Sequence, residues 1–348
     1  MPATVMAEHG QARLDATDRR IVDGLQGDFP LVSEPYRQAA ARLGIAEDEL
    51  LGRLDRLLGA RVLTRFGPMF QVERMGGRFV LAALAAPEAR FDEVAESVNR
   101  LPEVAHNYRR EHRLNMWFVL ATESADGIDA AIRRIEADTG LPVYAFPKER
   151  EYFVDMRLTV RQAADPEASG AGTVTAPETA PSPATAVRGS AGPSLTRSVV
   201  VATQAGLPLV RQPYRLIADQ LGCDEGAVIG CLAAMLESGA IRRIGAVPNH
   251  YAIGYVANGM SVWDVPDDAV DRLGQEVGAL PFVTHCYRRP RALPDWPFNL
   301  FAMVHGGCRD EVLARVAEIR AHLHRACRRY DVLFSSRILK KTGLRIGG

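Results

Sequence analysis

Apolar residues recur at helical spacing near the start of the chain, at Leu14, Ile21, Val22 and Leu25. Asp15, with Asp18 three residues later, fits the N-cap of a helix over residues 14–26. EPYRQAAARLG predicts a second helix, with Pro35 in its first turn and Gly44 just past its end. AEDELLGRLDRLL predicts a third helix, and VLTRFGPMFQ a short strand or wing. Three short helices and a wing predict a winged helix-turn-helix domain.

The pattern then changes to apolar strands that alternate with amphipathic helices. RFVLAALAA, VAHNYRR, NMWFVLATE and PVYAFPKEREYFV read as strands, the last of them as one final strand. FDEVAESVNRL and GIDAAIRRIEADTG read as helices. The order β-α-β-β-α-β predicts a ferredoxin-like domain.

The second half of the chain repeats the first. At an offset of 178 positions, identities include Pro30 with Pro208, Tyr36 with Tyr214, and Gly44 with Gly222. The offset becomes 179 at His106 and His285, and 184 at Asn115 and Asn299. The second copy therefore carries about five extra residues in PRALPDWPFN, after its Arg-Arg pair. Two homologous halves in one chain predict an internal pseudo-dimer.

Residues 163–198 separate the halves and are rich in Ala, Pro, Gly, Ser and Thr. Such a segment cannot bury enough apolar surface to offset its ordering entropy, so we expect a flexible linker. The expected fold class is α+β. The predicted parts are a disordered N-terminus (1–13), winged helix-turn-helix domains (14–74 and 199–252), ferredoxin-like domains (75–162 and 253–348) and the linker (163–198).

Bulk composition excludes several function classes. Lys and Arg number 42, Asp and Glu also 42, so no net charge favours nucleic acid or an anionic membrane. The five cysteines form no C-x-x-C pair, which is typical of reduced thiols in the cytoplasm. No signal peptide or transmembrane run is recognisable, so no membrane association is expected.

The helix that would read DNA is acidic in both copies. In the first copy it opens with Glu47, Asp48 and Glu49. In the second, residues 223–239 hold three acidic residues and no Lys or Arg. The phosphate backbone would repel such helices, so no DNA binding is expected.

Two cationic stretches, HNYRREHRLNMWF and HCYRRPRALPDWPFNLF, open with the same His-x-Tyr-Arg-Arg motif. On a strand the first, third and fifth residues share one face, namely His106, Tyr108 and Arg110, and then His285, Tyr287 and Arg289. Arg109 and Arg288 would point to the opposite face. A solvated edge strand is the simpler interpretation, but recurrence in both repeats and the flanking aromatic residues weaken it. Guanidinium groups beside aromatic rings suit a flat ligand with several carboxylates.

A helix-turn-helix domain followed by a ferredoxin-like domain resembles the Lrp/AsnC regulator family. The residues that carry this resemblance are Leu14-Asp15, Asp18, Ile21 and Leu25-Gln26. H-x-Y-R-R followed by N-x-W-F, the longer second motif and the terminal LFSSRILKKTGLR resemble the siroheme decarboxylase family, with its two homologous subunits fused. The resemblance implies a carboxy-lyase that removes carbon dioxide from the 12- and 18-acetate arms of siroheme. The product would be 12,18-didecarboxysiroheme, for heme d1 or alternative heme biosynthesis.

The resemblance also suggests roles for the cationic stretches. Imidazole titrates near neutral pH, so the histidines are candidate proton donors, with the tyrosines orienting them or donating directly. The candidate catalytic residues are His106, His285, Tyr108 and Tyr287. The candidate substrate-binding residues are Arg109, Arg110, His112, Arg113, Trp117, Arg288, Arg289, Arg291 and Asn299.

Other roles and functions remain open at this point. Either His106 or His285 could instead be an axial ligand to the iron of the substrate. No separate cofactor or protein-bound metal is required, because the iron belongs to siroheme. The expected partners are siroheme and other tetrapyrroles, and a further homo-oligomer is open. The alternative functions are a ligand-sensing Lrp/AsnC-type transcriptional regulator and a non-catalytic tetrapyrrole-binding protein.

Overall fold

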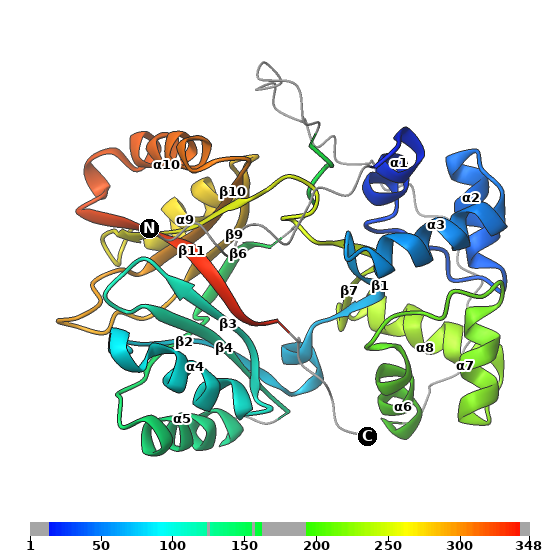
Figure 1. The fold of residues 1–348 in the computed structure, drawn as a ribbon, viewed down its shortest axis with the longest axis horizontal. Coiled ribbons are helices and arrows are strands. Elements are labelled where there is room, and N and C mark those ends of the chain that lie inside the picture. The colour runs from blue at the N-terminus through cyan, green and yellow to red at the C-terminus, as the bar shows by residue number, and fades with distance from the viewer. Residues whose placement is uncertain (1–13, 124–125, 155–156, 162–192, 342–348) are drawn as a thin grey trace. The chain divides into compact units, whose positions relative to one another are not determined.

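The computed structural model describes residues 14–123, 126–154, 157–161 and 193–341, which form two compact units (Figure 1). The barrel unit contains residues 76–154 and 255–341. The helical unit contains residues 14–75, 157–161 and 193–254. Each unit combines the matching domains of both copies, so the predicted internal pseudo-dimer is formed domain by domain. No helix in the described ranges is long and apolar enough to cross a membrane.

The helical unit contains both three-helix domains, and its first helix begins as predicted. The Asp15 carboxylate accepts a hydrogen bond from the Asp18 amide, and the Asp18 side chain accepts one from the Asp15 amide, which completes a capping box. Pro35 starts the second helix, and Gly44 ends it with a positive φ of 66°. The elements are α1 (Ala16–Gly24), α2 (Pro35–Leu43), α3 (Glu47–Gly59), β1 (Leu63–Phe70), η1 (Val72–Met75), α6 (Pro193–Thr203), α7 (Pro213–Leu221), α8 (Glu225–Glu237) and β7 (Ile241–Pro248).

The strand predicted as a wing pairs across the two copies. β1 and β7 form a two-stranded antiparallel sheet, with Gly67 opposite Gly245. A Cβ on Gly245 would lie 2.2 Å from the Leu25 carbonyl oxygen, so this close approach of backbones requires glycine. The buried tyrosines of the two copies join the same interface: the Tyr36 hydroxyl donates to the Pro208 carbonyl (3.0 Å) and the Tyr214 hydroxyl to the Pro30 carbonyl (2.9 Å).

The segments that link the domains differ in part from the predicted boundaries. Residues 193–198, expected in the linker, open helix α6. Residues 157–161, expected in the first ferredoxin-like domain, lie in the helical unit, where the Leu158 backbone exchanges two hydrogen bonds with the Gln26 amide. The predicted disordered N-terminus (1–13) and residues 163–192 of the predicted linker lie outside the described residues.

The barrel unit confirms the β-α-β-β-α-β order in both copies. The first copy consists of β2 (Arg78–Leu84), η2 (Glu88–Arg90), α4 (Phe91–Arg100), β3 (Val104–Arg110), β4 (Met116–Thr122), α5 (Asp126–Thr139), β5 (Tyr144–Pro147) and β6 (Arg150–Val154). The second consists of β8 (Ala257–Asp264), α9 (Val270–Gly278), β9 (Val283–Arg288), β10 (Leu300–Gly306), α10 (Arg309–Leu323), η3 (His324–Ala326) and β11 (Arg329–Lys341). The single final strand predicted for the first copy is divided into β5 and β6.

The nine strands described in the barrel unit join one sheet, in the order β5-β2-β4-β3-β11-β8-β10-β9-β6. Strand β11 pairs with β8 through its first half and with β3 of the other copy through its second half. Likewise β5 pairs with β2, whereas β6 pairs with β9 of the other copy. Only Lys148 and Glu149 separate β5 from β6, the two ends of this order, so the sheet curls back on itself as a barrel.

The two faces of the barrel have different cores. The helices cover one face: α4 and α5 pack on the strands of the first copy, and α9 and α10 on those of the second (Figure 1). The opposite face, which we call the inner face, carries a third apolar cluster drawn from both copies. Its aromatic members are Trp117, Phe146, Trp296, Phe298 and Phe301.

Candidate functional site

Both His-x-Tyr-Arg-Arg motifs lie on strands of the barrel, and their His and Tyr side chains share the inner face. In β3, His106 lies opposite Val119 and Tyr108 opposite Trp117. Strand β9 repeats this arrangement, with His285 opposite Met303 and Tyr287 opposite Phe301. Trp117 and Phe301 belong to the inner-face cluster, and directly opposed residues of an antiparallel pair point to the same side. The four side chains are half-buried.

Within each motif the rings are close neighbours. The His106 and Tyr108 ring centroids are 6.3 Å apart, and those of His285 and Tyr287 are 6.1 Å apart. The prediction that these residues share a strand face in each copy is confirmed. The two motifs are therefore equivalent in backbone placement, and any difference between them comes from their surroundings.

The fifth residue of each motif also stays with the inner-face aromatics. The Arg110 guanidinium lies 5.7 Å from the centroid of the Tyr108 ring and donates to the Leu333 carbonyl at 2.6 Å. The Arg289 guanidinium lies 4.9 Å from the Tyr287 ring centroid and donates to the Phe146 carbonyl at 2.5 Å. Each arginine thus fastens its motif to a strand of the other copy.

The fourth residue of each motif is held on the helix-covered face. Arg109 lies over the Phe91 ring and forms an ion pair with Glu88 at 2.7 Å. Arg288 forms ion pairs with Glu149 at 2.9 Å and with Asp271 at 3.5 Å. The structure therefore separates Arg109 and Arg288 from the histidines, as the strand alternation predicted, although both are among the candidate substrate-binding residues.

The extra residues of the second copy form a loop, residues 289–299, that inserts an aromatic side chain into the barrel; we call it the Trp296 loop. Trp296 is 0% exposed, and its ring centroid lies 4.9 Å from that of Trp117 and 5.3 Å from that of Phe146. Asp295 anchors the loop to the first copy, because its carboxylate accepts from the Tyr144 hydroxyl at 2.7 Å and pairs with Arg113 at 2.8 Å.

Three more candidate substrate-binding residues support this loop and its neighbours. Arg291 forms an ion pair with Asp264 at 2.8 Å and donates to the Val265 carbonyl at 2.6 Å. The Asn299 side chain accepts from the Val265 amide and donates to the Val265 carbonyl and to Asp267. Trp117, 1% exposed, donates from its indole to the Leu114 carbonyl. The structure thus places these three side chains among protein partners.

His112 lies between the two copies. Its ring meets Trp296 edge-on at 5.4 Å, and its Nδ1 accepts a hydrogen bond from the Leu114 amide. Burial lowers the pKa of His112, and the Asp331 carboxylate, 3.9 Å from Nε2, offsets only part of that effect. His112 therefore stays neutral at neutral pH and packs beside the Trp296 loop.

Two residues near His285, Thr284 and His305, were not among the site residues predicted from the sequence. The Thr284 hydroxyl lies 3.0 Å from Nδ1 of His285 and 3.2 Å from Nδ1 of His305. His305 is 3% exposed and lies on the neighbouring strand β10. The available signal was the difference between the copies, since the aligned first-copy positions hold Ala105 and Ala121.

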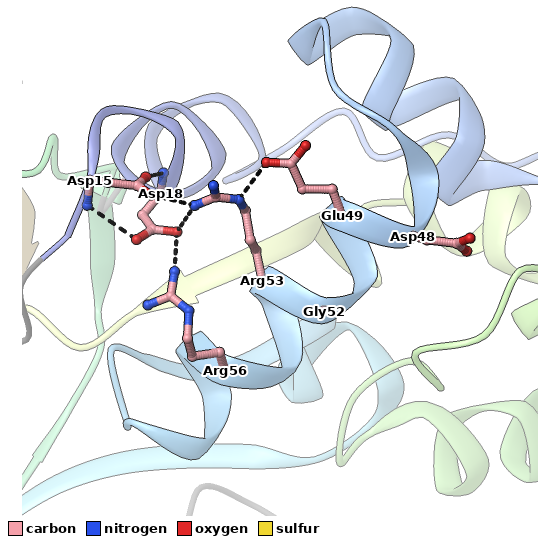
Figure 2. A pocket seen from close by; sticks show the side chains of 7 residues that line it. All are labelled: Asp15, Asp18, Asp48, Glu49, Gly52, Arg53 and Arg56. Carbon is pink, nitrogen blue, oxygen red and sulfur yellow. Dashed lines mark hydrogen bonds and ion pairs between the residues drawn. The ribbon is translucent and has the colours of Figure 1, made fainter.

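A separate hollow of about 440 Å³ lies in the helical unit, over α1 and α3 (Figure 2). Arg53 of α3 forms ion pairs with Asp15, Asp18 and Glu49, and Arg56 forms one with Asp18. The hydrogen bond from Arg53 lowers the pKa of Asp15 to about 2. These arginines of the helix that would read DNA are thus matched by carboxylates of their own domain.

The first turns of α3 and α8, which occupy the position of a DNA-reading helix, also contact the other copy. Asp48, in the first turn of α3, pairs with Arg211 at 2.9 Å. Glu225, in the first turn of α8, accepts from the Ser33 hydroxyl at 3.1 Å. The end of each helix that would approach base edges thus takes part in the contact between the two copies.

Family models and solved structures match this architecture. The AsnC-like ligand binding domain matches residues 74–152 and 252–340, and the siroheme decarboxylase NirDL-like HTH domain matches residues 18–63 and 196–242. The siroheme decarboxylase NirDL subunit of Paracoccus denitrificans (strain Pd 1222) is 33% identical over 340 residues, 96% of this chain and 98% of that protein.

Two further relatives bear on the duplication and on the ligand. The siroheme decarboxylase NirH subunit of Paracoccus pantotrophus is 57% identical over 150 residues, which is 43% of this chain and 93% of that subunit. The crystal structure of the siroheme decarboxylase NirDL in co-complex with an iron-uroporphyrin III analogue superposes with a TM-score of 0.68. Its sequence identity is 28%, over 94% of each chain.

Proposed function

Because the chain belongs to the siroheme decarboxylase family, in its fused NirDL-like form, we propose that it decarboxylates siroheme. The reaction removes carbon dioxide from the 12- and 18-acetate arms and yields 12,18-didecarboxysiroheme, so the enzyme is a carboxy-lyase. The product enters heme d1 or alternative heme biosynthesis. The observation that carries the proposal is the pair of His-x-Tyr-Arg-Arg strands whose histidines and tyrosines share the inner face of one barrel.

Each decarboxylation requires a proton donor. The bond between the methylene carbon and the carboxylate breaks, carbon dioxide leaves, and the electron pair stays on the methylene carbon. That carbon then forms a bond to one proton and becomes a methyl group. His106 and His285 supply this proton, since imidazole titrates near neutral pH, and Tyr108 and Tyr287 lie beside them to orient the ring or the arm.

The inner-face arginines suit the arms that do not react. Arg110 and Arg289 lie beside the tyrosine rings, on the side of the sheet that carries the histidines. A guanidinium paired with the reacting carboxylate would stabilise the ground state and oppose loss of carbon dioxide. The reacting arm is better placed against apolar rings, where its charge is poorly solvated before it disperses. Arg109 and Arg288, which are paired with carboxylates on the other face, position the strands.

The remaining assignments follow from this chemistry. The iron belongs to the substrate, so no separate cofactor is needed, and an axial bond to that iron is the alternative role of either histidine. The ligands are siroheme and other tetrapyrroles, and the enzyme acts in the cytoplasm. The helical unit serves as a dimerisation scaffold without DNA binding, because Arg53 and Arg56 already pair with Asp15 and Asp18.

Anaerobic incubation of the purified protein with siroheme, followed by mass spectrometry, tests the proposal. We expect siroheme to lose two molecules of carbon dioxide. Unchanged siroheme bound at one equivalent would identify a tetrapyrrole-binding protein instead. Nanomolar binding to a specific DNA duplex at physiological salt, without turnover, would identify a regulator.

Separate His106→Ala and His285→Ala variants test whether the two copies contribute differently. We expect unequal losses of turnover, because the loops that follow the two motifs differ in length and contacts. His322→Ala is the matched control: this histidine lies on α10 of the same unit and pairs at the surface with Glu276. Equal losses in the two motif variants would refute functional divergence of the copies.

A further inference from the structure

We propose that Thr284 and His305 are positioning residues that fix the ring orientation and tautomer of His285, and that only the second copy has this device. The inference rests on the proposed decarboxylation, in which His285 donates a proton. It concerns two residues that lie outside the His-x-Tyr-Arg-Arg motif.

The three side chains form a continuous hydrogen-bonded row. The Thr284 Oγ1 atom lies 3.0 Å from His285 Nδ1 and 3.2 Å from His305 Nδ1, and it lies 3.4 Å from the Met303 carbonyl oxygen. Thr284 and His305 are 6% and 3% exposed, whereas His285 is half-buried. The row therefore runs from the buried interior of the sheet to a histidine that a ligand can reach.

A β-bulge makes this row possible. Val283 lies opposite Val304 and His285 opposite Met303, so Thr284 is the extra residue on β9. A bulge of this kind redirects a side chain that regular alternation would place on the other face. The Thr284 hydroxyl is thereby brought beside the ring of the next residue and within reach of His305 on β10.

The first copy has the same bulge without the polar groups. Val104 lies opposite Leu120 and His106 opposite Val119, so the extra residue there is Ala105. Neither the methyl group of Ala105 nor that of Ala121, which aligns with His305, can hydrogen-bond the imidazole of His106. Since the backbone irregularity is common to both copies, the side chains alone distinguish the two histidines.

The Thr284 hydroxyl has a single hydrogen, which can point to the Met303 carbonyl oxygen or to a bare Nδ1 of His305. In either case Oγ1 has no hydrogen left for His285, so Nδ1 of His285 must carry its own hydrogen and donate it to Oγ1. In this arrangement Nε2 of His285 is the atom that gives up a proton to the substrate carbon and regains one afterwards. Nδ1 keeps its hydrogen throughout, so the ring does not need to turn during turnover.

Other ionisable groups lie around the row. On the side of β6, Glu151 lies opposite Tyr287 and pairs with Lys148 at 2.8 Å, and Lys148 lies 6.0 Å from the Tyr287 ring centroid. On the other side, Arg315 of α10 donates to the His305 carbonyl and pairs with Glu311. These neighbours include matched pairs of opposite charge, whereas Thr284 contacts Nδ1 of His285 directly.

A Thr284→Val variant tests the inference, because valine keeps the branched shape of threonine and replaces the hydroxyl with a methyl group. We expect kcat for siroheme to fall about tenfold to hundredfold, the range seen when hydrogen-bond partners that orient metal-ligating histidines are removed. KM should change little. Thr284→Ser should restore most of kcat, and His305→Leu should reproduce the loss, whereas His305→Asn, which keeps an acceptor near the Nδ1 position, should retain more activity.

Ring-nitrogen chemical shifts of His285 in the ligand-free protein provide a readout that does not depend on turnover. We expect the Nδ1–H form in the wild-type protein and a change of tautomer in Thr284→Val. Thr139→Val is the matched control: Thr139 is also buried in the barrel unit, and its hydroxyl donates to the Ile135 carbonyl within α5. This control should alter neither kcat nor the His285 shifts.

The outcomes separate this inference from the proposed function. If the wild-type protein decarboxylates siroheme and Thr284→Val matches it in kcat and His285 shifts, the inference is wrong and the function stands. If the wild-type protein does not decarboxylate siroheme, the proposed function fails. In that case the shifts alone decide whether Thr284 sets the His285 tautomer, and unchanged shifts in Thr284→Val would overturn the inference.

Discussion

Replacing Trp296 by alanine should strongly destabilise the barrel unit. The side chain is 0% exposed and contacts Trp117, Phe146 and Phe301 within the inner-face cluster. A buried tryptophan removes about 150–250 Å² from water, which at about 25 cal/mol per Å² corresponds to about 4–6 kcal/mol. Truncation of buried Trp or Phe to Ala costs about 3–5 kcal/mol in other proteins, so we expect about 4 kcal/mol here.

Tryptophan fluorescence during thermal unfolding measures this effect on the barrel unit specifically. The chain has three tryptophans, Trp117, Trp263 and Trp296, and all three are buried in that unit. For a unit of this size, about 4 kcal/mol corresponds to a fall in Tm of about 8–16 °C. The remaining two tryptophans still report unfolding in the variant.

Two further variants make the comparison decisive. The indole nitrogen of Trp296 has no hydrogen-bond partner among the described residues, so Trp296→Phe loses no hydrogen bond, leaves a smaller cavity than alanine and should cost clearly less than Trp296→Ala. Leu293→Ala, on the same loop but 71% exposed, should stay within about 0.5 kcal/mol of the wild-type protein. A fall in Tm of only one or two degrees in Trp296→Ala would refute the conclusion that this loop is part of the barrel core.

Two predictions concern the helical unit. The hydrogen bond from Arg53 lowers the pKa of Asp15 from 3.8 to about 2, so the stabilising effect of the Asp15 carboxylate is complete above pH 3.8 and is lost as the pH falls through about 2. The difference in urea midpoint between the wild-type protein and Asp15→Asn should therefore shrink over that pH range. A constant difference would contradict the ion pair. Tyr36→Phe should lower the free energy of unfolding by about 1 kcal/mol in urea titrations, because the hydroxyl that donates to the Pro208 carbonyl is lost. Tyr330 is exposed, so Tyr330→Phe should not change the free energy of unfolding. An equal effect of both variants would argue against the contact.

Local features of the sequence predicted the elements well. The capping box at Asp15, the glycine stop at Gly44 and the six elements of each ferredoxin-like domain depend on residues near one another in the chain. Strand alternation also predicted which residues of the repeated motif share a face. These signals are short-range, and tertiary packing did not override them.

Pairing between the copies could not be predicted in the same way. Strand β1, predicted as a wing, pairs with β7, the equivalent strand of the second copy. The segment PVYAFPKEREYFV pairs with two different strands, β2 through β5 and β9 through β6. Nothing in the period of such a strand says which partner it has, because backbone hydrogen bonds do not depend on the side chains. The ion-pair partners of Arg109 and Arg288 could not be predicted either, because Glu88 and Asp271 are distant from them in the chain.

The duplication itself accounts for the differences between the two copies. In a symmetric dimer one sequence forms both sides of the assembly, so a residue introduced on one side appears on the other. In the fused chain the copies change independently, and the second alone carries the Trp296 loop, Thr284 and His305. The loop fills the inner face with an aromatic side chain, while the other two residues hold the histidine of the same copy. Both changes fall in one copy and leave the strand pairing intact, so the barrel keeps its approximate two-fold symmetry while its two histidines differ in their surroundings.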